Sequence, residues 1–118
     1  MITADEVRRL ALSLPGAEEQ ETWGHPTFRV RDKIFASLGP DGVEGGVKAS
    51  LQEQSLLISS DPESFSIADY VGRYGWVSVK LATVDPEVMR TIVVEAWRRT
   101  APKRLVKEYD ARHPPAET

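Results

Sequence analysis

Hydrophobic residues recur at helical spacing near the start of the chain and predict its first element. They form a single apolar stripe: Val7, Leu10, Ala11 and Leu14. Thr3 and Glu6 have the spacing of a capping box, in which each side chain satisfies a backbone N–H of the first turn. Proline cannot continue a helix and glycine tolerates a left-handed exit, so the helix is expected to end at 15–16.

Alternation of polar and apolar residues predicts strands in the middle of the chain. Segment 18–23 is polar with a terminal aromatic residue, as in an edge strand. In 28–31, Phe28 and Val30 share one face and both arginines the other. We interpret Asp32-Lys33 as the turn of a hairpin over 28–38. A turn at 39–42 then leads to a strand over 43–49, where the pair Gly45-Gly46 indicates a bulge or a close backbone approach.

The second half of the chain reads as helices around one further strand. Ser50 and Glu53 form a second capping box, and Leu51, Leu57 and Ile58 share a face of the helix that follows. The remaining elements are expected as a helical turn from Asp61 to near Phe65, a glycine-rich loop over 70–75, a strand over 76–81, the longest helix from Asp85-Pro86-Glu87, and a short helix over 103–109.

These elements predict an α+β fold. We expect a two-layer α/β sandwich in which an antiparallel sheet of about five strands carries helices on one face. The length of 118 residues is enough for one core of ordinary size. We therefore predict a single domain over 1–112 and a C-terminal tail over 113–118.

Composition narrows the functional classes. The sequence has no cysteine, which excludes disulfides, thiolate metal sites and cysteine nucleophiles. It has no long apolar run and no basic-then-apolar leader, so we expect no membrane association and a cytoplasmic location. His25 and His113 are far apart in sequence, so we predict no metal site, and no cofactor motif is present.

Charge is unevenly distributed along the chain. The net charge is −3, but segments 1–24 and 49–72 carry −3 and −4 while 25–48 and 73–112 carry +1 and +4. The run from Arg98 to Lys107 holds five bases and no acid. A local basic surface can bind a polyanion despite the acidic total, although long-range steering is then weak.

Several sequence pieces occur together in the order of a known family. They are Leu14-Pro15-Gly16, Trp23-Gly24-His25-Pro26, the segment 28–36, Gly72-Arg73-Tyr74-Gly75-Trp76-Val77, and a long helix ending near 97–103. In this the chain resembles the MmcQ/YjbR family over about residues 3–110. The resemblance implies a CyaY/frataxin-like fold and a DNA-binding role linked to β-hairpin wings. It does not carry iron binding, because fold alone does not transfer function.

Exposed cations and aromatic residues are the candidate contacts. Residues 29–33 offer cations on a hairpin, although a solvated strand face has the same composition. The aromatic residues fit base stacking or a ligand, and Trp76 also fits a packed sheet residue. The nucleic-acid candidates are Arg29, Arg31, Lys33, Lys48, Arg73 and Lys80. The stacking or ligand candidates are Trp23, Tyr74 and Trp76.

From the resemblance and the local basic segments we expect a DNA-binding protein. We do not expect an enzyme, because no nucleophile with a base and an orienting partner is visible around His25. With a net charge of −3, DNA binding should be weak and strongly salt-dependent. The alternative is a protein-interaction or small-ligand-binding module. A continuous basic surface would favour nucleic acid, and a concave apolar pocket lined by aromatic residues would favour a ligand.

Overall fold

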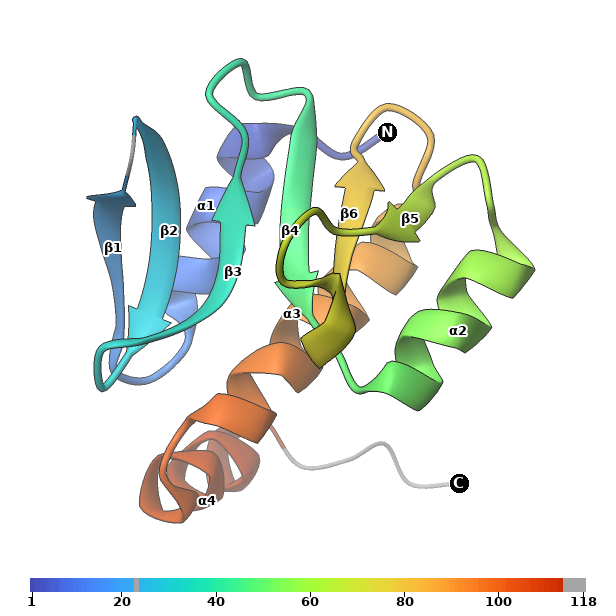
Figure 1. Ribbon diagram of the computed structural model, residues 1–118. Coiled ribbons are helices and arrows are strands. Elements are labelled where there is room, and N and C mark those ends of the chain that lie inside the picture. Colours follow the sequence, from blue (N-terminus) through green and yellow to red (C-terminus); the bar gives the residue numbers. More distant parts are fainter. Residues whose placement is uncertain (23, 114–118) are drawn as a thin grey trace.

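The computed structural model describes residues 1–22 and 24–113, and in this part of the chain a six-stranded sheet backs onto helices (Figure 1). The strands are β1 (Ala17–Thr22), β2 (His25–Val30), β3 (Lys33–Leu38), β4 (Glu44–Lys48), β5 (Phe65–Ile67) and β6 (Trp76–Lys80). The helices are α1 (Ala4–Ser13), α2 (Leu51–Ser60), the short 3₁₀ helix η1 (Gly72–Tyr74), α3 (Pro86–Thr100) and α4 (Lys103–Arg112).

All neighbouring strands are antiparallel, in the order β1-β2-β3-β4-β6-β5. Helices α1 and α3 cover one face of the sheet, α2 stands beside β5 and β6, and α4 follows the lower end of α3 in the view of Figure 1. Phe28, Phe35, Val77, Val79 and Met89 belong to the core between the layers. The other face of the sheet is open. The predicted α+β sandwich with helices on one face is confirmed.

Helix termini follow the sequence closely. Thr3 and Glu6 form the predicted reciprocal capping box of α1, and Asp85 caps α3 ahead of Pro86. Ser50 caps α2, but the carboxylate of Glu53 pairs with Arg99 at 3.0 Å and completes no box. Helix α4 ends at Arg112. Most of the predicted tail, 114–118, lies outside the described residues, so the boundary stays a prediction.

The hairpin between β2 and β3 turns one residue earlier than predicted. Arg31 and Asp32 are the turn, with φ of 53° and 66°, and Lys33 is the first residue of β3. Val30 and Lys33 pair across this two-residue loop, and positive φ at both turn residues matches the twist of the strands. Arg31 therefore lies at the tip and does not share the strand face with Arg29.

Strand β3 contains a bulge that the alternation did not predict. Its register with β2 shifts between Phe28 and Arg29, so that β3 carries one extra residue. Phe35 and Ala36 are consecutive, yet both are fully buried in the core. The bulge allows this because the two residues at such an irregularity point to the same side. Ile34 and Ser37, on either side of them, are left on the open face.

The segment after α2 also differs from the expectation. The predicted helical turn from Asp61 to near Phe65 is present, since the N–H groups of Ser64 and Phe65 both donate to the Asp61 carbonyl. The chain then continues from Phe65 as β5, a strand that we did not predict. Phe65 is buried opposite Val79. Pairing with β5 gives hydrogen-bond partners to backbone groups on the side of β6 that does not face β4. Leu51 does not share the packed face of α2, since its side chain is exposed. None of the helices over residues 1–22 and 24–113 combines the length and apolarity needed to cross a membrane.

Candidate binding groove

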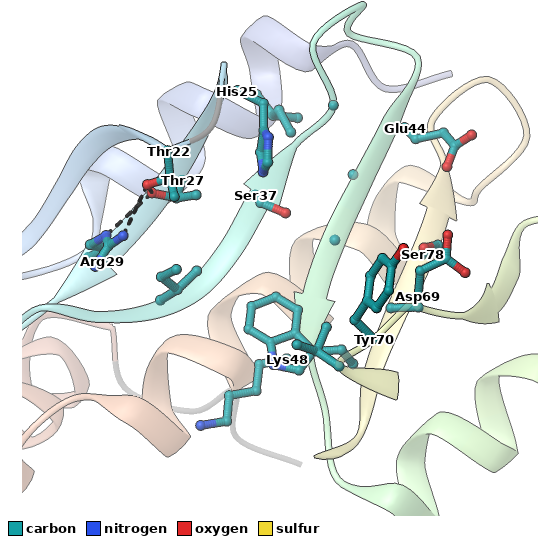
Figure 2. Close-up of a pocket in the computed structure, with 18 of the residues that line it drawn as sticks. Thr22, His25, Thr27, Arg29, Ser37, Glu44, Lys48, Asp69, Tyr70 and Ser78 are labelled. Atoms are coloured by element: carbon teal, nitrogen blue, oxygen red, sulfur yellow. Dashed lines mark hydrogen bonds between the residues drawn. The ribbon is translucent and has the colours of Figure 1, made fainter. Parts of the chain in front are cut away.

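A row of small residues crosses the middle of the open face. Strand pairing places four positions side by side on β2, β3, β4 and β6: Thr27, Ser37, Gly46 and Ser78. These side chains are short, so the sheet surface is hollow along the row, between larger residues on both sides (Figure 2). The hollow is a groove of about 890 Å³, open to solvent. The row forms its floor.

One wall of the groove is basic and aromatic. Arg29 pairs across the strands with Ile34, and Lys48 pairs with Trp76, so these residues border the same side of the floor. Arg29 is held in place: its Nη2 donates to Thr22 Oγ1 at 3.0 Å and its Nη1 to the Asp32 carbonyl at 3.3 Å. These hydrogen bonds order the Arg29 side chain, so binding a ligand there would cost less conformational entropy.

The opposite wall carries His25 on β2 and Glu44 on β4, each two residues from the floor. Asp69 and Tyr70 reach the groove from the loop after β5 and lie beside Ser78 (Figure 2). The two walls therefore differ in charge. Arg29, Lys33 and Lys48 border one side together with a single acid, Asp32, and Glu44 borders the other.

Gly46 keeps the floor of the groove open. A Cβ at this position would lie 2.7 Å from the Ser37 hydroxyl and 3.9 Å from the Trp76 ring. The sequence analysis offered a bulge or a close approach at Gly45-Gly46, and the strand pairing here is regular. Close approach by neighbouring side chains is the reason for glycine at position 46. The half-buried Trp76 ring lies over Gly46, in the space that a larger side chain would occupy.

Gln54 fixes the loop that ends the groove. This side chain is buried on α2, and its Nε2 donates to the carbonyls of Gly72 and Trp76, both at 2.8 Å. Gly75 is the last residue of this loop before β6, and its φ is 102°. Tyr70 has φ of 65° and its side chain is 96% exposed. A non-glycine residue held in this conformation, with its ring in solvent, is typical of a functional loop.

Cations near the groove differ from those on the helical layer. Six arginines form ion pairs with acids: Arg8, Arg9, Arg90, Arg98, Arg99 and Arg112. The hydrogen bonds from Arg98 to Asp110 are strong enough to lower the pKa of that carboxyl below its usual value. The other three cations of the helical layer, Lys103, Arg104 and Lys107 on α4, form no ion pair among the described residues.

Five other cations lie at the end of the sheet where β2 and β4 end and β3 and β6 begin, the lower end in Figure 1. No carboxylate among the described residues lies within ion-pair distance of them. We call this set the basic rim: Arg29, Arg31, Lys33, Lys48 and Arg73.

Comparison with known proteins identifies the family. The model of the YjbR family matches residues 12–99. The chain belongs to the YjbR family. Uncharacterized proteins of Mycobacterium bovis and Mycobacterium tuberculosis are 27% identical to this YjbR chain, over 92% of its length and 96% of theirs. The crystal structure of a Deinococcus radiodurans protein with a DUF419 domain is similar in fold, with a TM-score of 0.75 and 21% identity over 82% of this chain and 77% of that one.

In this YjbR-family chain, the predicted site residues divide into three groups. Arg29, Lys33, Lys48 and Trp76 line the groove. Arg31, Arg73 and Tyr74 lie outside it, on the turn and on η1, and the Arg73 guanidinium stacks 4.9 Å from the centre of the Tyr74 ring. Lys80 lies at the opposite end of β6, paired in register with Glu44. Trp23 lies outside the described residues.

The floor and the acidic wall of the YjbR-family groove were not among the predicted site residues. The missed positions are His25, Thr27, Ser37, Glu44, Gly46, Asp69, Tyr70 and Ser78. Two local signals pointed to this surface: the alternation that places Trp76 and Ser78 on one face, and the pair Gly45-Gly46, which indicated a bulge or a close approach. Residues 1–22 and 24–113 contain no cluster of three or more His, Cys, Asp or Glu side chains placed to hold a metal ion. The groove therefore combines hydroxyls, cations and carboxylates with the rings of Trp76 and Tyr70 and with apolar side chains such as Ile34 and Leu38.

Proposed function

We propose that this YjbR-family protein binds DNA, without catalysing a reaction, and that the sugar–phosphate backbone lies along the basic rim. The observation that carries the proposal is the contrast between the two sets of cations. Six arginines of the helical layer are paired with acids, and only Lys103, Arg104 and Lys107 of α4 are not, whereas all five rim cations are free of carboxylate partners in the described structure. Free cations in a row are what a polyanion needs.

The family resemblance implied DNA contacts from β-hairpin wings, whereas the basic rim extends over several elements. Residues 29–33 supply one hairpin, but the rim continues across the sheet through Lys48 to Arg73 on η1. Lys80, the remaining candidate, lies at the other end of β6 and is left out of the proposed contact. Arg29 supports the proposal most directly, because its guanidinium is already oriented by Thr22 and by the Asp32 carbonyl.

Affinity should be low and strongly dependent on salt. Phosphate contacts release counterions, and the net charge of −3 opposes the approach of a second polyanion. Four or five rim contacts would give a salt slope of about −3 to −4.5, taking about 0.7 to 0.9 per neutralised phosphate. We assign this role to the cytoplasm, as expected from a sequence without cysteine.

Replacing single rim cations tests the proposal. We expect Arg29→Gln and Lys48→Gln each to weaken DNA binding about threefold and to reduce the salt slope by about 0.7 to 0.9. The measurement is a fluorescence anisotropy titration between about 20 and about 200 mM salt. Lys80→Gln is the matched control, since it removes the same charge from the open face outside the rim, and it should change neither quantity.

Two results would contradict DNA binding at the rim. One is the absence of binding to any nucleic acid at the lowest salt. The other is an equal loss of affinity in Lys80→Gln and in the two rim variants, which would indicate a response to net charge alone.

A small-ligand function is the second candidate, and the groove itself favours it. A volume of about 890 Å³ lies within the range of ligand pockets, about 300 to 1,000 Å³. Trp76 offers a flat apolar surface beside the fixed guanidinium of Arg29. Titration with adenosine monophosphate distinguishes the candidates. Saturable binding of this mononucleotide as tight as that of an oligonucleotide would favour a small-ligand module over a DNA-binding one.

A further inference from the structure

The two walls of the groove match the two ends of a single nucleotide. Lys48, Gly46 and Glu44 occupy alternate positions of β4 and face the groove. At about 3.3 Å per residue, the backbone positions of Lys48 and Glu44 are about 13 Å apart. A cation thus stands on one side of the hollow and a carboxylate on the other. This spacing fits a phosphate at Lys48 and a base edge near Glu44.

Trp76 pairs with Lys48 across the strands, and its ring extends from there to the floor at Gly46, between the two ends. The ring is near enough to the floor that a Cβ on Gly46 would be 3.9 Å from it. An aromatic ring in an open groove stacks on the face of a base. Bases within a duplex stack on one another and offer only their edges, so a base must leave the stack to reach Trp76.

The floor and the acidic wall would then meet the polar edge of that base. Ser37 and Ser78 have hydroxyls that both donate and accept hydrogen bonds, whereas Glu44 and Asp69 accept only. Carboxylates accept from the amino group of cytosine. Thymine has a carbonyl oxygen at the same position, which a carboxylate repels. The acidic wall therefore discriminates between two bases of the same size.

We infer that the groove binds single-stranded DNA in preference to duplex and, among pyrimidines, prefers cytosine to thymine. The inference rests on the proposed function and names the form of DNA and the base that the groove takes. The basic rim holds the backbone, Trp76 stacks on one base, and Glu44 reads its amino group.

Three ligands of equal length test the inference: oligo-dC, oligo-dT and a mixed duplex of about twelve units, within the known range of single-strand sites. Anisotropy at low salt and neutral pH should give dissociation constants about tenfold lower for oligo-dC than for duplex, and about fivefold lower for oligo-dC than for oligo-dT. Trp76→Leu should weaken single-strand binding about tenfold and leave duplex binding unchanged.

Glu44→Gln separates base reading from general electrostatics. Removing a negative charge should strengthen binding of both oligonucleotides, but the ratio between oligo-dC and oligo-dT should fall to about one, because an amide donates to thymine as well as it accepts from cytosine. Glu63→Gln is the matched control: it removes an exposed carboxylate outside the groove and should preserve the ratio. Thermal melting confirms that each variant is folded, and Trp76→Tyr, which keeps a stacking ring, should recover most of the single-strand affinity.

Failure of the inference is distinguishable from failure of the proposed function. Duplex binding as tight as that of oligo-dC, or a ratio that Glu44→Gln leaves unchanged, would overturn the inference while DNA binding stands. Absence of binding to all three ligands would overturn both.

Discussion

Gly75→Ala is expected to lower the free energy of unfolding by about 3 kcal/mol or more. Gly75 has φ of 102°, where side chains are rarely tolerated, and an added Cβ would lie 2.1 Å from the carbonyl oxygen of Ala49. That oxygen belongs to the backbone after β4 and cannot rotate away. The Ala49 N–H also donates to the Gly75 carbonyl, so both segments would have to move.

Thermal melting measures the effect of Gly75→Ala, and a loss of this size lowers the Tm by about 12 °C for a domain of this length. Gly24→Ala is the matched control. Gly24 also has positive φ, 85°, but no atom lies within 4 Å of its added Cβ. It should cost only the conformational strain, about 1 kcal/mol. Equal losses in the two variants would contradict the role of the contact between Gly75 and Ala49.

Gly46→Val should leave the protein folded and weaken single-stranded DNA binding at least thirtyfold, about 2 kcal/mol. The new side chain would occupy the floor of the groove beside Trp76, where a base is proposed to stack. Valine favours strands, and the nearest obstacle is the hydroxyl of Ser37, which can rotate. The change therefore fills the groove at little expected cost to the sheet.

The titration of Gly46→Val needs a variant that adds the same bulk elsewhere on the sheet. Ser66→Val does so, because Ser66 is exposed and pairs with Ser78 on the side away from β4, outside the groove. It should bind as the unmodified protein does. Undiminished binding by folded Gly46→Val would contradict a ligand seated on the floor.

Local signals in the sequence were sufficient for the starts of three helices and for the two faces of β6. The capping residues Thr3, Ser50 and Asp85 act within one helical turn, so their positions predict the starts of α1, α2 and α3. Alternation within 76–81 correctly separates Trp76 and Ser78 from the buried Val77 and Val79. Each of these features depends only on residues nearby in the chain.

The groove depends on pairings that no local pattern contains. Ser37, Gly46 and Ser78 are neighbours because β3 pairs with β4 and β4 pairs with β6, across an intervening helix and strand. The bulge beside Phe35 shifts the alternation of β3 by one residue, which moves Ile34 and Ser37 to the same face. Strand β5 was missed because it is three residues long and is stabilised by its contact with β6.

The sequence alone does not show which of its charged residues form ion pairs in the fold. The run 98–107 appeared to be a basic surface, but Arg98 and Arg99 bind Asp110 and Glu53, which come from other helices. Arg29 appeared to be one of two equivalent strand arginines, yet Arg31 lies in the turn. Which cations are free is a tertiary property, because their partners are distant in sequence.

The unpaired cations of α4 lie at the same end of the molecule as the basic rim. Lys103, Arg104 and Lys107 on α4 lie near the rim, because Leu105 of the same helix lies against the start of β1 at Gly16. Glu44, Asp41 and Glu87 lie toward the other end of the sheet. A molecule of this polarity turns in the field of any anionic partner and meets it with the basic end first. The gain is in the association rate, and it disappears when salt reduces the Debye length to well below the size of the domain.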